Sequence, residues 1–246
     1  RCMNHYRTIW ISDVHLGSLN CNATVLLDFL KYNNAEKIYL VGDIIDGWML
    51  KKKWYWPQEH NDVIQKLLRK ARNGASLIYI PGNHDEGVRQ FVGLCFGEIY
   101  IKRDDIHMTL HGEKLWVTHG DQMDPVMFSS KWASKLGDFL YGIVTFASRI
   151  IHKMRQIIGY DYWSLSTYLK GKAKNAVRYV QRFERLMADE AQRKGHVGLV
   201  CGHIHQPAKK IIGGIQYYNT GDWVDSGSVL VEKNSGEIEL VYWKIL

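Results

Sequence analysis

Five short segments of the chain carry histidine and carboxylate residues that could hold metal ions. Each segment follows a short apolar run, and together they extend over most of the 246 residues. The segments are Asp13-Val14-His15, Gly42-Asp43-Ile44-Ile45-Asp46, Gly82-Asn83-His84-Asp85, His119-Gly120-Asp121 and Gly202-His203-Ile204-His205. They offer enough nitrogen and oxygen ligands for two metal ions. Because a pair of ions activates water against phosphate esters, the pattern indicates two-metal hydrolysis.

Seven side chains in these segments form the candidate ligand set: Asp13, His15, Asp43, Asn83, His119, His203 and His205. Mixed imidazole and oxygen ligation suits Mn²⁺, whereas Mg²⁺ and Ca²⁺ prefer sites made only of oxygen ligands. Asp43 could bridge the two ions, since a carboxylate has two oxygens, and each ion would then have four protein ligands. We therefore expect two divalent cations as cofactors, with Mn²⁺ as the expected metal.

The apolar runs before the motifs are typical of β-strands, and helical patterns lie between them. Strands are predicted at 6–12, 37–41, 77–80, 115–118 and 197–201, which are short and rich in β-branched and aromatic residues. Helices are predicted at 24–33 and 60–73, with Gly74 where the second would stop. This alternation predicts an α/β fold. Residues 209–246 read as β-hairpins with turns at 213–214 and 234–236, so a mixed sheet is expected.

The motifs share one position, the carboxyl end of a predicted strand. In open α/β sheets, the loops that leave one sheet edge converge on a common crevice. Ligands that are far apart in the sequence are therefore expected to meet there.

Residues 125–195 differ in character from the rest and predict a helical insertion within a single domain covering 1–246. They hold 13 Lys and Arg against 5 Asp and Glu, whereas the whole chain carries a net charge of +7. Residues 136–151 are strongly apolar, and an apolar helical stripe continues to Phe183. The insertion reads equally as a cap packed on the body or as a membrane-surface element, with a solvated helix face as the plainer alternative.

Other features bear on the compartment and on partners. The four cysteines show no disulfide-framework or C-x-x-C spacing, which favours a reducing compartment. No apolar stretch is long enough to cross a bilayer, and the chain begins with Arg1 rather than Met. We expect a cytoplasmic protein, with peripheral contact to an anionic membrane surface as an option, and no nucleic-acid partner. The oligomeric state is left open.

The ordered motifs resemble those of the calcineurin-like metallophosphoesterase superfamily, over nearly the whole chain. The resemblance implies a β-sandwich flanked by helices. It implies one metal ion held by Asp13, His15, Asp43 and His205, and a second held by Asp43, Asn83, His119 and His203. It also implies that His84 stabilises or protonates the leaving oxygen and that Asp46 orients His84. A carboxylate partner fixes the imidazole tautomer and favours its protonated form.

Within that superfamily the chain looks most like the UDP-2,3-diacylglucosamine pyrophosphohydrolases of lipid A synthesis. Asp46-Gly47-Trp48 matches their pattern of an acidic residue, a small residue and Trp, and they share a basic, partly apolar insertion. That branch typically has Arg at the position of His84 and Glu at the position of Asp46. The expected substrate is a phosphate or pyrophosphate ester with a lipid portion, giving UMP and a lipid phosphate. The alternatives are a soluble nucleotide or cyclic-nucleotide phosphodiesterase and, remotely, a non-catalytic interaction module.

Some further residues are candidates for lesser roles. Substrate contacts are predicted for Arg89, Trp48, Lys170, Lys174 and Arg178. The loop 47–60 could stack a nucleobase beside lysines, although packed aromatics with solvated lysines are slightly favoured. Asp85 and Asp121 are expected to hydrogen-bond to the site rather than to ligate. No metal role is assigned to His5, His60, His107, His111, His152 and His196, and turn structure is the favoured role of Asn219, Gly221 and Asp222.

Overall fold

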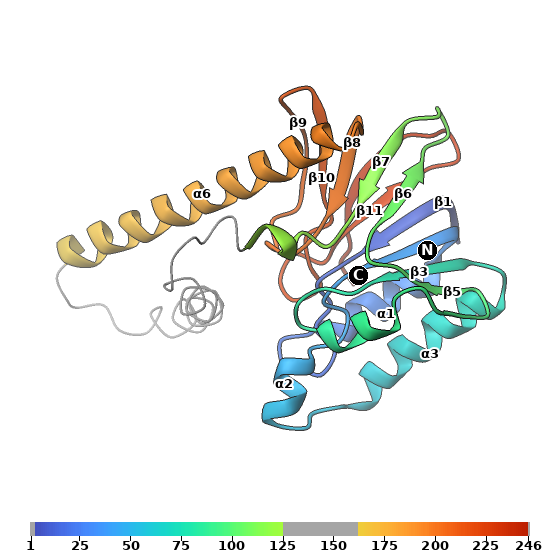
Figure 1. Cartoon of the computed structure of the whole chain (residues 1–246). Coiled ribbons are helices and arrows are strands. Elements are labelled where there is room, and N and C mark those ends of the chain that lie inside the picture. Colours follow the sequence, from blue (N-terminus) through green and yellow to red (C-terminus); the bar gives the residue numbers. More distant parts are fainter. Residues whose placement is uncertain (1–2, 125–161, 246) are drawn as a thin grey trace. The chain divides into compact units, whose positions relative to one another are not determined.

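The computed structural model describes residues 3–124 and 162–245, with side chains described up to 124 and from 176 onward. The chain divides into two compact units. One comprises Arg1–Asp121 with Glu184–Leu246, and the other comprises Gln122–Phe183. All of the described strands and the five motifs lie in the first unit (Figure 1).

The first unit contains a mixed sheet of seven strands in the order β12-β11-β1-β2-β3-β5-β4. Strands β1, β2, β3 and β5 run parallel, and β4, β11 and β12 pair antiparallel to their neighbours. The strand bounds are β1 (Asn4–Ile11), β2 (Asn33–Val41), β3 (Ser76–Ile80), β4 (Cys95–Phe96), β5 (Ile99–Ile101), β11 (Ser228–Glu232) and β12 (Ile238–Tyr242).

A second mixed sheet has five strands in the order β6-β7-β8-β10-β9. Strands β7, β8 and β10 are parallel, and β6 and β9 are antiparallel edge strands. Their bounds are β6 (Asp105–Met108), β7 (Lys114–Val117), β8 (Gly198–Cys201), β9 (Ala208–Ile212) and β10 (Ile215–Asn219).

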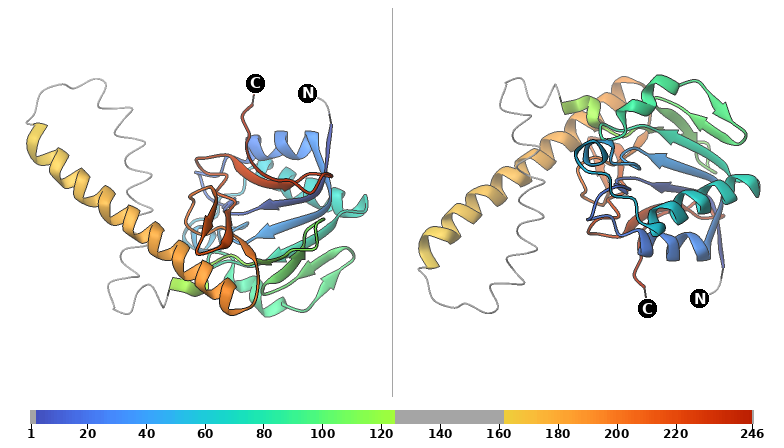
Figure 2. Two further views of the ribbon diagram at one scale, coloured as in Figure 1. Left: turned by 90° about the horizontal axis from the view of Figure 1, so that it is seen from above. Right: turned by 90° about the horizontal axis from the view of Figure 1, so that it is seen from below.

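The core follows from the two-residue period of the strands. On β1, Ile9 and Ile11 pack into one cluster with the helices α1 (Ala23–Tyr32) and α3 (Gln58–Arg72), while Trp10 packs into a second cluster with residues of the five-stranded sheet. The views from above and below show both helices along the seven-stranded sheet (Figure 2). The sheets thus form a sandwich with helices against its outer face.

Three of the loops that leave the sheets contain short helical segments. They are α2 (Gly47–Lys52) and the 3-10 turns η1 (Glu86–Phe91) and η2 (Asp121–Met123). The long helix is α6 (Tyr162–Arg193), and its residues from Glu184 onward belong to the first unit, in which Met187, Ala188 and Ala191 are buried. The predicted apolar run 136–151 lies outside the described residues. Within the described part of the chain, no helix is both long enough and apolar enough to cross a membrane.

The structure confirms the predicted architecture and refines its bounds. All five predicted strands and both helices are present, and Gly74 lies just after α3 with φ 98°. Both C-terminal hairpins are present, β9 with β10 and β11 with β12. Prediction missed β4, β5 and β6, and it missed the start of β2, where Asn33 and Asn34 have low β propensity.

Candidate metal centre

Five loops bring the candidate ligands together. Three of them follow β1, β2 and β3 of the seven-stranded sheet, and two follow β7 and β8 of the five-stranded sheet. The expectation that every motif stands at the carboxyl end of a strand is confirmed. The convergence spans two sheets rather than one edge, because the sandwich places the ends of both sheets' parallel strands at the same site.

The backbone of these loops is unusual at the ligand positions. Among the described residues, the non-glycine residues with positive φ are Asp13 (50°), His15 (55°), Asp43 (53°), His203 (71°) and His205 (51°). All five belong to the candidate ligand set. A side chain in the left-handed region is uncommon and costs free energy, on the order of 1 kcal/mol or more, so such residues gather at functional sites.

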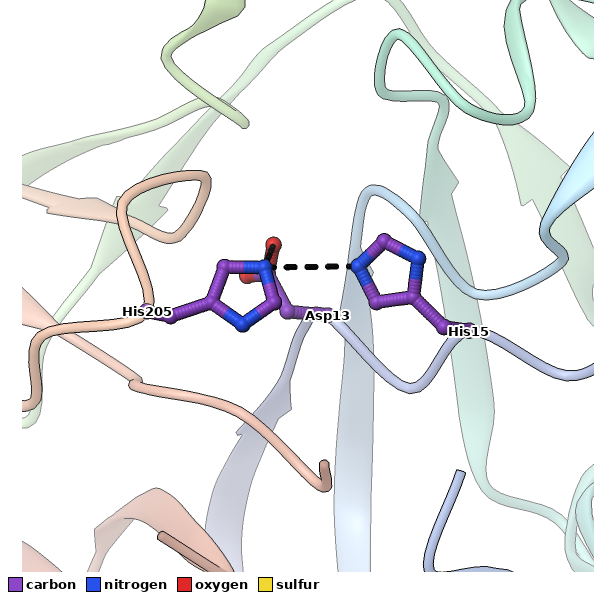
Figure 3. A group of neighbouring side chains, drawn as sticks. All are labelled: Asp13, His15 and His205. Atoms are coloured by element: carbon purple, nitrogen blue, oxygen red, sulfur yellow. Dashed lines mark hydrogen bonds and ion pairs between the residues drawn. The ribbon is translucent and has the colours of Figure 1, made fainter. Parts of the chain in front are cut away.

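One cluster of ligand atoms is formed by Asp13, His15 and His205 (Figure 3). His15 Nε2 lies 3.3 Å from His205 Nε2, and His205 Nε2 lies 3.4 Å from Asp13 Oδ1. Asp13 and His15 come from the loop after β1, and His205 comes from the loop after β8. Asp13 Oδ1 is buried without a hydrogen-bond partner, whereas Oδ2 accepts hydrogen bonds from the His203 amide and Ser12 Oγ.

The second cluster is formed by Asp43, His119 and His203, with Asn83 beside it. His119 Nδ1 lies 2.8 Å from the carbonyl oxygen of Val41, so Nδ1 carries the proton and donates it to that carbonyl. The other ring nitrogen, Nε2, lies 3.3 Å from both Asp43 Oδ2 and Asn83 Oδ1. In the neutral imidazole this tautomer leaves a lone pair on Nε2, as metal ligation requires.

Asp43 lies between the two clusters. Its Oδ2 is 3.3 Å from His119 Nε2 in one cluster and 3.9 Å from His15 Nε2 in the other. Its Oδ1 accepts a hydrogen bond of 2.8 Å from the amide of His84. A carboxylate in this position has the geometry needed to bridge two cations.

The electrostatics of these groups also suit cations. Burial alone would raise the pKa of Asp43, but the imidazoles of His119, His15 and His84 outweigh it and hold that pKa well below its usual value. Burial would lower the pKa of His119, but Asp43 outweighs it and raises the pKa well above its usual value. The buried carboxylates therefore stabilise positive charge at this place.

Three glycines leave room for the ligand side chains, because these side chains lie where a Cβ atom would stand. A Cβ built on Gly82 would collide with Asp43 Oδ1 and would lie 2.7 Å from His119 Nε2. A Cβ on Gly42 would collide with the His119 ring, and one on Gly202 would collide with Asp13 Oδ2. The unpartnered Asp13 oxygen, the His119 tautomer and these glycines together show that the residues fit a divalent-metal centre.

Comparison with known proteins agrees with this geometry. The family model of the calcineurin-like phosphoesterases matches residues 6–207. The chain belongs to this family.

Two relatives align with nearly the whole of this chain. The UDP-2,3-diacylglucosamine hydrolase of Histophilus somni (strain 2336) is 26% identical over 251 residues, covering 94% of this chain and 97% of that protein. The protein of that name from Haemophilus influenzae (strain PittGG) is 25% identical and covers 94% and 97%. Among solved structures, the E. coli phosphoesterase YfcE is 17% identical with a TM-score of 0.46, covering 96% of this chain and 99% of that one. The family match and the two relatives confirm the predicted superfamily and the predicted metal-dependent hydrolase activity.

In this phosphoesterase Asp46 holds two histidines, of which the sequence predicted one. His84 Nδ1 donates to Asp46 Oδ1 at 3.0 Å, and His15 Nδ1 donates to Asp46 Oδ2 at 3.1 Å. Asp46 also caps α2 by accepting from the amide of Met49 at 2.9 Å. Burial would raise the pKa of Asp46, but the hydrogen bonds from both imidazoles outweigh it and hold that pKa low. The third group of neighbouring ligand-type atoms, His15, Asp46 and His84, is therefore a hydrogen-bonded triad.

Trp48 contacts the triad directly. Its ring centroid lies 4.1 Å from that of His84, with an angle of 34° between the planes. His15 meets His84 edge-on at 4.6 Å. His84 is thus fixed at Nδ1 by Asp46 and at its ring face by Trp48, and its side chain is 17% exposed.

Buried polar residues support the ligand loops. Asp85 accepts from the amides of Gly82 (2.5 Å) and Ile44 (2.9 Å) and from Tyr79 Oη (2.6 Å), which agrees with its expected hydrogen-bonding role. Asp222 accepts from three amides of the turn that follows it and lies 4.0 Å from His205 Nδ1. Asn219 donates to the carbonyl of Gly202 at 2.8 Å. No motif in the sequence marked the link between Asp222 and His205.

The residues predicted to contact the substrate lie in different parts of the chain. Trp48 lies at the site, as described above. Arg89 is exposed and paired with Asp121 at 2.5 Å, so Asp121 binds an arginine rather than the ligand residues. Arg178 is exposed on α6 in the second unit. The side chains of Lys170 and Lys174 lie outside the described residues.

Proposed function

We propose that this phosphoesterase hydrolyses the pyrophosphate bond of a nucleotide-linked lipid of the UDP-2,3-diacylglucosamine type, giving UMP and a lipid phosphate. The carrying observation is the pair of ligand clusters with Asp43 between them, in a chain that aligns with UDP-2,3-diacylglucosamine hydrolases over nearly its whole length. The expected setting is lipid A synthesis at the cytoplasmic face of the membrane.

The clusters support an assignment of ligands to two metal positions. Asp13, His15 and His205 would hold one ion and Asn83, His119 and His203 the other, with Asp43 shared between them. Mn²⁺ suits this mixed set of nitrogen and oxygen ligands. When bound, the ions would lower the pKa of water and neutralise charge on the phosphate oxygens.

His84 supplies the remaining polar group of the proposed reaction. Its Nδ1–H is held by Asp46, which leaves Nε2 as the atom that faces a substrate. From this atom the ring would donate a proton to the oxygen that leaves with one phosphate, as a general acid does. Trp48 limits rotation of the ring, so the proton is delivered from one direction.

Hydrolysis of the lipid nucleotide is the direct test. Purified protein with Mn²⁺ should release UMP from UDP-2,3-diacylglucosamine in detergent micelles, as followed by phosphorus NMR. Asp43→Ala should abolish release, whereas Asp189→Ala, which removes an exposed carboxylate on α6, should not. No UMP with Mn²⁺, Mg²⁺ or Co²⁺ would reject this substrate.

A second candidate is a soluble nucleotide or cyclic-nucleotide phosphodiesterase. It is favoured by the His84 and Asp46 pair, which stands where the lipid-specific branch typically has Arg and Glu. The same preparations, assayed with 2′,3′-cyclic and 3′,5′-cyclic nucleotides, separate the two functions. Turnover of a cyclic nucleotide at a higher kcat/KM than the lipid substrate would favour the second candidate.

A further inference from the structure

We propose that the end of α2 binds the anionic surface of a lipid bilayer. The α2 tip comprises Lys51, Lys52, Lys53 and Trp54, four consecutive exposed residues. Trp54 has 73% of its surface exposed, the largest fraction among the described tryptophans. A large apolar ring held in water is unfavourable unless a partner covers it.

The lysines of the α2 tip have no counter-ion among the residues that the structure describes. Within the part of the chain that the structure describes, no carboxylate forms an ion pair with any of its three lysines. The next acidic residue along the chain, Glu59 on α3, also makes no ion pair with them. The tip therefore presents three positive charges beside an exposed indole. Tryptophan with lysine is a typical combination at the boundary between bilayer and water.

Both ends of the tip are anchored to the body. On one side Asp46 caps α2, and the amide of Lys53 bonds the carbonyl of Met49 at 2.9 Å. On the other side Trp56 packs against the main core cluster and meets His60 edge-on at 5.6 Å. In Figure 1 α2 lies apart from both sheets. The tip is thus presented outward on a fixed support, so binding orders few additional residues.

The shape of the tip favours a surface over a small anion. A nucleotide or phosphate site needs donors that converge on an enclosed position, whereas these lysines are consecutive and all exposed. A bilayer with anionic headgroups offers an extended negative plane, which complements a row of lysines. Each lysine near such a surface contributes roughly 1 kcal/mol to binding.

The position of the tip fits a lipid-linked substrate, and in this respect the inference rests on the proposed function. Trp48, which contacts His84, is the second residue of α2, and the tip lies at the other end of this helix. Six helical residues span about 9 Å at ~1.5 Å per residue. A bilayer bound at the tip would therefore lie close to the catalytic histidine, where a lipid nucleotide could be reached from the membrane.

Vesicle binding tests the proposal independently of the reaction. Wild-type protein should sediment with vesicles of phosphatidylglycerol and phosphatidylcholine. The triple change Lys51→Gln, Lys52→Gln, Lys53→Gln should weaken the partition constant on the order of 100-fold, and Trp54→Ala about 10-fold. The matched control removes three exposed positive charges elsewhere, by Lys31→Gln, Arg69→Gln and Arg72→Gln, and should bind as the wild type does.

A second readout locates the contact. Vesicles with brominated acyl chains should quench part of the tryptophan fluorescence, and Trp54→Phe should bind normally but lose that quenching. All variants should hydrolyse bis(p-nitrophenyl) phosphate at the wild-type rate, which shows that they are folded.

Three results would overturn the proposal: wild type that ignores anionic vesicles, a lysine triple variant that binds undiminished, or tip-dependent binding to single-stranded RNA without binding to vesicles. Hydrolysis of the lipid nucleotide in detergent micelles does not depend on the tip, so failure of one proposal is distinguishable from failure of the other.

Discussion

Asp46→Asn should separate the two tasks of the carboxylate that joins the metal site to His84. The wild-type side chain accepts from His84 Nδ1 at 3.0 Å and from His15 Nδ1 at 3.1 Å. An amide has one acceptor oxygen, so its NH₂ group must face one of the two imidazoles. That imidazole then loses its partner or changes tautomer, and the other keeps a weaker, uncharged hydrogen bond.

The size of the effect follows from the bonds that are lost. A hydrogen bond to a charged group contributes about 1.5–3 kcal/mol, which corresponds to roughly 10- to 150-fold. If the NH₂ faces His15, Mn²⁺ affinity should fall about 10- to 100-fold. If it faces His84, kcat should fall by a similar factor. The oxygen that accepts from His84 also caps α2 at the amide of Met49. The melting temperature should therefore change little if the NH₂ faces His15, and it should fall if the NH₂ faces His84, because the cap is then lost.

Asp46→Ala should lower both Mn²⁺ affinity and kcat, and it should cost about 1 kcal/mol of stability through the lost cap. Metal affinity is measured by competition with a fluorescent chelator, and kcat with bis(p-nitrophenyl) phosphate at saturating Mn²⁺. In a His84→Ala background, Asp46→Ala should still weaken Mn²⁺ binding. Wild-type metal affinity in that double variant would refute the inferred link to His15, and wild-type kcat in Asp46→Ala would refute the link to His84.

Three other substitutions have defined outcomes. Gly82→Ala places a methyl group against Asp43, so Mn²⁺ content measured by atomic absorption should fall more than 10-fold, while Gly87→Ala, with open space around it, should retain metal. Glu232→Gln should lower the free energy of unfolding by about 1–3 kcal/mol at neutral pH. Burial would raise the pKa of Glu232, but its hydrogen bonds lower it, so the carboxylate stabilises the fold above its unfolded pKa. Urea titrations should show that this difference disappears as the pH falls below about 4. Burial lowers the pKa of Lys70 to about 8. Between that value and the ordinary lysine pKa, the unfolded state therefore binds more protons than the folded state. The free energy of unfolding of the wild type should rise with pH in this range, and that of Lys70→Met should not.

The site was more predictable than the sheet edges, for a physical reason. Ligand chemistry restricts residue types, so the order of Asp, His and Asn after apolar runs carries strong information. Strand β6 carries no comparable restriction. Its sequence Asp105-Ile106-His107-Met108 includes a buried histidine whose place is fixed by Glu232, 125 positions away in the sequence. Such a contact leaves no local pattern.

The same limit applies within the site. Asp46 could be paired with His84 from the motifs, but its second bond to His15 depends on how the loops after β1 and β2 approach each other. The backbone amides of Val14 and His15 both bond the carbonyl of Asp43, which fixes that approach. Likewise, the pairing of Arg89 with Asp121 arises from loops that belong to different sheets. Spacing along the chain does not encode these distances.

The left-handed conformation of five candidate metal ligands sets stability against activity in this protein. Glycine would relieve each of these positions, because it adopts positive φ without steric cost. Asp13, His15 and Asp43 also make buried hydrogen bonds that glycine would remove. Laboratory evolution that rewards heat resistance alone should therefore favour glycine at His205 and yield more stable, inactive variants. Selection for hydrolysis retains side chains at these positions, although their backbone conformation favours glycine.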